Sequence, residues 1–128
     1  MEKEFVPYEE SYQLKPLGFA EPCFAYYGEI NGGEIELFFK RNFDTEARYV
    51  LAPTFSQAFR WFRKKYHIIG VIDFYNDGDI WEDTMYRVTI SEFEHFKTHD
   101  TFVQYEYQTY EEAELACLRK LIDIVKNK

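Results

Sequence analysis

Two stretches of the chain, TFSQAFRWFRKKY at 54–66 and TYEEAELACLRKL at 109–121, begin in the same way. Each opens with a Thr, and Gln57 or Glu112 follows three residues later. This spacing is a capping box, in which the Thr hydroxyl accepts a hydrogen bond from a free backbone N–H and the longer side chain reaches back to the cap. We therefore predict two helices that begin at these threonines.

The residues before the first of these helices and between the two predict several strands and one further helix. Pro7 suits the first turn of a helix that we expect to reach about Leu17, although Pro16 falls in its last turn, and to end at Gly18. Alternation of apolar and polar residues indicates strands. Their predicted ranges are 23–27, 34–40, 69–75, 80–90 and 101–108, and residues 91–100 fit either a loop or a short helical turn.

This order, α-ββ-α-ββ(β)-α, predicts an α+β fold. We expect one domain, 1–128, built as a two-layer sandwich in which helices cover one face of an antiparallel sheet of four to five strands. The similarity of the two helix starts suggests a ββα pseudo-repeat with halves 23–66 and 69–126. Duplication and convergence both explain it, because good helix starts resemble one another.

The chain is acidic, with a net charge of −8 that is unevenly distributed. Residues 1–66 carry 9 basic and 10 acidic side chains, whereas residues 67–128 carry 6 and 13. An acidic protein repels a phosphate backbone, so general nucleic-acid binding is disfavoured.

The cysteine content and the N-terminal sequence indicate the cellular compartment of the protein. Cys23 and Cys117 are the only cysteines and form no CxxC motif, which is typical of buried thiols in a reducing cytosol. The first ten residues, MEKEFVPYEE, lack the pattern of a signal peptide. We expect a cytoplasmic protein.

No motif of known chemistry stands out. His95 and His99 have a spacing that would place two imidazoles on one helix face, but the HExxH order is absent. Asp73, Asp77 and Asp79 resemble a calcium loop only loosely. We therefore expect no metal, no cofactor and no enzyme activity, with a small metal-dependent hydrolase that uses carboxylates as an alternative.

The strongest candidate for binding is the basic side of the helix at 54–66. Its residues Arg60, Trp61, Arg63 and Lys64 form a compact group, and Arg and Trp are enriched at interaction hot spots. Three readings stay open: pairing with the chain's own acidic half, a protein partner, and nucleic-acid contact by a regulator.

A second candidate surface consists of apolar residues on the otherwise polar face of the predicted sheet. These residues are Phe38, Met85 and Phe102. Several such residues on neighbouring strands form a patch that predicts a weak to moderate homodimer. The alternative is that the helix at 7–17 covers this face within one molecule.

Three segments carry a resemblance to a known group. LGFAEPCFAYY at 17–27, APTFSQAFRWFRKKY at 52–66 and TYEEAELACLRKLI at 109–122 resemble small proteins of bacteriophages and prophage-like mobile elements that have no assigned activity. The resemblance implies an accessory protein of a bacterial cytoplasm and supplies no site residues. Together with the missing catalytic motifs, it predicts a non-enzymatic protein-binding module whose partner is its own copy or a host or phage factor.

Overall fold

The computed structural model describes residues 2–30, 32–39, 49–76, 78, 84–94 and 97–128, and the side chains of residues 2, 93–94 and 97–104 are not part of that description. The chain divides into two compact units, Met1–Ala58 and Phe59–Lys128. The expected single domain stays a prediction.

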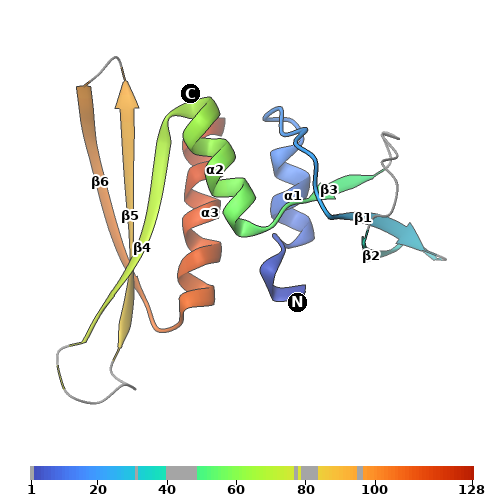
Figure 1. Ribbon diagram of the computed structural model, residues 1–128, viewed down its shortest axis with the longest axis horizontal. Helices are drawn as coiled ribbons and strands as arrows, with labels where there is room; N and C mark the ends of the chain where they lie inside the picture. The colour runs from blue at the N-terminus through green and yellow to red at the C-terminus, as the bar shows by residue number, and fades with distance from the viewer. Residues whose placement is uncertain (1, 31, 40–48, 77, 79–83, 95–96) are drawn as a thin grey trace. The chain divides into compact units, whose positions relative to one another are not determined.

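Each unit contains one three-stranded antiparallel sheet, so the predicted α+β class is confirmed (Figure 1). The single sheet of four to five strands is wrong, because the described residues form six strands in two sheets. In chain order, after a short 3-10 helix at Glu2–Glu4, the elements are α1 (Tyr8–Leu14), β1 (Ala25–Ile30), β2 (Glu34–Phe39), β3 (Val50–Ala52), α2 (Phe55–Tyr66), β4 (Ile68–Tyr75), β5 (Met85–Glu94), β6 (Lys97–Tyr107) and α3 (Tyr110–Lys126).

The first sheet has the strand order β2-β1-β3, with β1 in the centre. Strand β3 escaped prediction because its three residues are too few to show an alternating pattern. One face of the sheet packs around Phe5, Ala25 and Ala52, with Tyr27 and Leu37 against them. Helix α1 packs against β3 in this unit.

Helix α1 is shorter than predicted. It ends at Leu14, three residues before the expected Leu17, because Pro16 has no backbone N–H to continue the ladder. A turn follows, in which the Phe19 N–H donates to the Leu14 carbonyl at 3.2 Å. Gly18 takes the left-handed conformation, with φ of 97°, as predicted for the residue that ends this segment.

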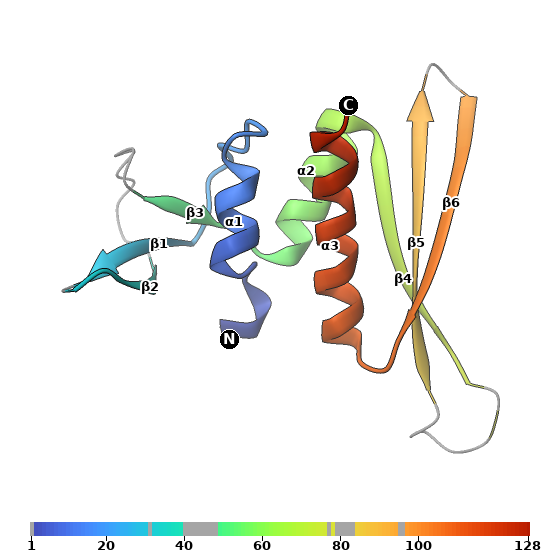
Figure 2. The same cartoon turned by 180° about the vertical axis from the view of Figure 1, so that it is seen from behind.

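The second sheet is a meander of order β4-β5-β6, and α3 packs against it (Figure 2). Ile68, Val88 and Ile90 are buried on the strands. The buried face of α3 consists of Ala113, Cys117, Leu118, Leu121, Ile122 and Val125, whereas Leu115 is half-buried. This unit is a layer of helix on a layer of sheet.

Residues 91–94 and 97–100 belong to strands β5 and β6 rather than to a loop or helical turn, and residues 95–96 lie outside the described part of the chain. The ladder sets Glu92 opposite His99 and Glu94 opposite Lys97, with an irregularity in register between Ile90 and Glu92. This register depends on pairing between strands, which the local sequence does not display.

The two predicted helix starts are confirmed. Helices α2 and α3 begin one residue after Thr54 and Thr109. The hydroxyl of Thr54 accepts from the Gln57 N–H at 3.2 Å, and the Gln57 side-chain oxygen accepts from the Thr54 N–H at 3.0 Å. Thr109 accepts from the Glu112 N–H at 3.1 Å. Both helices follow three strands, but the strand orders β2-β1-β3 and β4-β5-β6 differ, so the similarity at the caps does not extend to the sheets.

Candidate interaction surface on helix α2

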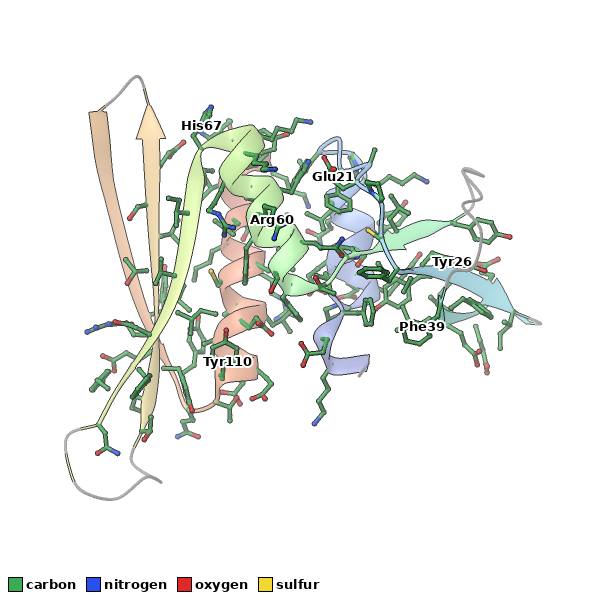
Figure 3. All side chains as sticks on the ribbon, in the orientation of Figure 1. Glu21, Tyr26, Phe39, Arg60, His67 and Tyr110 are labelled. Atoms are coloured by element: carbon green, nitrogen blue, oxygen red, sulfur yellow. The ribbon has the colours of Figure 1, made fainter. Side chains whose placement is uncertain are left out.

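Helix α2 presents a continuous row of basic side chains. Arg60, Arg63 and Lys64 have the spacing of neighbours on one helix face, and all three are exposed. Figure 3 labels Arg60 on this helix. Among the described residues, none of the three makes an ion pair with a carboxylate. The alternative in which this face pairs with the chain's own acidic half therefore has no support in the described part of the protein.

Trp61 does not belong to this exposed row, contrary to our expectation. Its side chain is only 6% exposed and contacts the rings of Phe62 and Tyr66 at centroid distances of 5.0 and 5.4 Å. The ammonium of Lys65 lies 5.3 Å from the Trp61 ring centroid. Trp61 follows buried Ala58 by three residues, so the helical period itself places it on the apolar stripe. The candidate surface is therefore basic rather than aromatic.

His67 ends α2 in an unusual backbone conformation. Its φ of 57° lies in the left-handed region, and among the described residues it is the one non-glycine with a positive φ. Asn, Asp and His enter this region more readily than other side chains. His67 is exposed and links α2 directly to β4, so it extends the polar end of the basic face (Figure 3).

The three apolar candidates do not share one sheet. Phe38 lies on β2 in the first sheet, whereas Met85 begins β5 and Phe102 lies on β6 in the second. Phe38 and Met85 are half-buried, and the Phe102 side chain lies outside the description. These three residues therefore do not lie on neighbouring strands of one sheet, and a patch that involves them stays a prediction.

Phe38 has a role within its own unit. Its ring stacks on Tyr26 at 5.5 Å, and Tyr26 contacts Tyr49 at 4.8 Å. Gly28 lies between the rings of Phe38 and Tyr49, since a Cβ built on Gly28 would lie 3.4 Å from Tyr49 and 3.5 Å from Phe38. Aromatic rings that cover a glycine stabilise a sheet, which explains an apolar residue on a face with Glu34 and Glu36.

In the second sheet, an ion pair joins two strands. The Arg87 Nε donates to the Asp73 Oδ1 at 3.0 Å, and this hydrogen bond lowers the pKa of the Asp73 carboxyl. The Arg87 guanidinium also lies 5.7 Å from the Tyr75 ring centroid. Asp73 therefore has a structural partner, which counts against its use in a calcium loop.

The remaining metal candidates lie largely outside the description. His95, Asp77 and Asp79 fall in undescribed segments. His99 lies on β6, a strand, so it does not share a helix face with its neighbour. In the described ranges, no three His, Cys, Asp or Glu side chains are gathered in a group that could hold a metal ion.

Both cysteines are buried free thiols, as predicted. Burial raises the pKa of the Cys117 thiol to about 12, and the negative charge of Glu114 adds to the shift. A thiol that stays protonated is a poor nucleophile. Cys117 instead fills space against Gly70, where a Cβ would lie 2.4 Å from its Sγ.

Comparisons with protein-family models, with curated proteins and with solved structures find no match to this chain. Within the described residues, none of the helices combines the length and the apolar character that crossing a membrane requires.

Proposed function

We propose that this chain is a non-enzymatic protein-binding module, an accessory protein of phage or mobile-element origin, and that the basic face of α2 binds an acidic segment of a protein partner. The observation that carries the proposal is the exposure of Arg60, Arg63 and Lys64 without a carboxylate partner among the described residues. On a chain of net charge −8, unpaired cations in a row favour an external anion.

A protein partner fits this surface better than nucleic acid does. A single basic helix face contacts few phosphates, and the acidic remainder of the chain repels a phosphate backbone. Arg60 and Arg63 present planar guanidinium groups that match carboxylates in a two-point contact. The face is therefore suited to Asp and Glu side chains on a folded or extended partner.

The test is affinity capture from a nuclease-treated bacterial lysate, with three baits: the wild-type protein, R60E/R63E, and the control K3E/K15E. Lys3 and Lys15 are exposed and lie far from α2 in sequence, so the control makes the same change in net charge. We expect proteins that the wild type and the control retain and that R60E/R63E loses. Retention of the same proteins by all three baits would contradict the proposal.

A direct measurement separates the two partner classes. Fluorescence anisotropy with a labelled polyglutamate peptide and with a short DNA duplex gives both affinities over a salt series. We expect the peptide to bind the wild type and the control more tightly than R60E/R63E. If the wild type binds the duplex more tightly than the peptide, with a steep salt dependence, the basic face of α2 is a nucleic-acid-binding site and the proposal of a protein partner is wrong.

A further inference from the structure

The four sheet edges of this protein are not equally protected. Strand β2 carries exposed Glu34 and Glu36, and β3 has only three residues before Pro53. Strand β6 carries several charged residues and an irregular register with β5. Charges, short length and irregularities are the features by which proteins prevent a free edge from pairing with another chain.

Strand β4 has none of these protections. Its eight residues, Ile68–Tyr75, pair with β5 without a break, and they include no Pro and no Lys. Its single charge, Asp73, is already engaged by Arg87 of β5. Val71 and Phe74 are 50% and 65% exposed. Among the described residues, the backbone groups of 68–74 make no hydrogen bond outside the ladder to β5, apart from the Asp73 N–H, which also contacts its own carboxylate. A regular row of backbone donors and acceptors is therefore available.

We propose that β4 is an interface, and that its occupant is β4 of a second copy of this chain, paired antiparallel about a twofold axis. Such a dimer joins two three-stranded sheets into one of six strands, and each copy satisfies the other's free backbone groups. This inference is independent of the function proposed for α2.

The register follows from the side chains. Residues directly opposite in an antiparallel pair share a face, so a twofold axis at a residue keeps both copies of α3 on the same side. An axis at Asp73 would set two carboxylates opposite each other. An axis at Ile72 would place Phe74 over Gly70, where Cys117 already fills the space. An axis at Val71 avoids both the pair of carboxylates and the crowding at Gly70. It places the two exposed Val71 side chains opposite each other and sets Asp73 opposite Ile69.

The first test is the mass in solution, by size-exclusion chromatography with light scattering over a concentration series. We expect the wild type to approach twice its monomer mass of 15.5 kDa as concentration rises. Val71→Lys adds a charge at the interface and should remain monomeric. The control Phe24→Lys changes an apolar side chain that is 72% exposed in the other unit, and it should dimerise like the wild type. A wild type that stays at the monomer mass, or a V71K dimer, would overturn the proposal.

The second test is cross-linking, which does not depend on the folding of V71K. With the axis at Val71, the two Cα atoms of Val71→Cys lie about 4.5–5.5 Å apart, within reach of a disulfide. Phe74→Cys is the control, because Phe74 faces Ile68 and its own copy lies about 20 Å away. The native cysteines are buried and can remain. We expect rapid oxidation of V71C to a covalent dimer and little of F74C. Equal rates for the two variants, or no V71C dimer, would refute this pairing.

Discussion

The two sheets use glycine in opposite ways. In the first sheet, Gly28 lies on the central strand β1, and the rings of Phe38 and Tyr49 close over it. In the second, Gly70 lies on the edge strand β4 and leaves room for Cys117 of α3. The first sheet thus covers a glycine with aromatic rings from its own strands, while the second uses a glycine to let a helix approach. Two segments with matching helix starts therefore reach stability by different packing.

The largest effect that we expect comes from Trp61→Ala. Because Trp61 is buried, its removal should destabilise the protein by about 3–5 kcal/mol. The control Phe24→Ala removes an exposed ring and should change the free energy of unfolding by no more than about 0.5 kcal/mol. Urea denaturation measures both. A small change in the free energy of unfolding for Trp61→Ala would show that Trp61 is exposed and belongs to the candidate surface.

Substitutions at Gly70 and Gly28 should give the next largest difference in stability. Gly70→Ala forces a Cβ to within 2.4 Å of the Cys117 Sγ and should destabilise by about 1–3 kcal/mol. The double variant G70A/C117A should recover much of that loss, because the clashing sulfur is gone. Gly28→Ala meets only ordinary contacts at 3.4 Å and should be close to neutral. If thermal denaturation ranks G28A as the more damaging change, the comparison is wrong.

Stability should also depend on pH through Cys117. Its pKa rises from 9.0 to about 12 on folding, so the folded state holds this proton to higher pH than the unfolded state. The contribution is fully present below pH 9.0 and is lost as the pH rises toward 12, by up to about 1.4 kcal/mol per pH unit. Denaturation of wild type and Cys117→Ala across this window isolates the effect. Parallel curves for the two proteins would exclude it.

The smallest effects separate the two caps. Thr54→Ala and Thr109→Ala should each cost about 1 kcal/mol. In α2 the Gln57 side chain also bonds to the cap, so a double-mutant cycle between Thr54 and Gln57 should show a coupling of about 0.5 kcal/mol or more. In α3 the bond uses the backbone N–H of Glu112, and the matching cycle should show little. Equal couplings would mean that the two helix starts are alike in energy as well as in sequence.

The sequence predicted what is local. The helix starts at Thr54 and Thr109 and the turn at Gly18 depend on neighbouring residues, and the structure confirms them. Strand β3 and the ends of β5 and β6 depend on partners from elsewhere in the chain, so short or charged segments such as 91–94 gave no signal. The strand orders β2-β1-β3 and β4-β5-β6 also depend on pairing between distant segments, so the sequence pattern did not predict them.

The candidate surface was predicted in part. Arg60, Arg63 and Lys64 are exposed on one face, as the helical period indicates. Trp61 was misplaced because its hot-spot chemistry outweighed its spacing from Ala58, which favours burial. Nothing in the strand of Phe38 itself shows that Tyr26 and Gly28 lie beside it, so this packing could not be predicted from the local sequence.

The order of the strands tests the account most directly, because the glycine comparison and the free edge at β4 both depend on it. Nuclear Overhauser effects between backbone protons should connect Tyr26 with both Phe38 and Leu51, which places β1 in the centre. In the second sheet, Val88 should connect with both Ile72 and Tyr105, while β4 connects with no other strand of its own chain. Effects that join β2 directly to β3, or β4 to a strand of the first unit, would contradict the account.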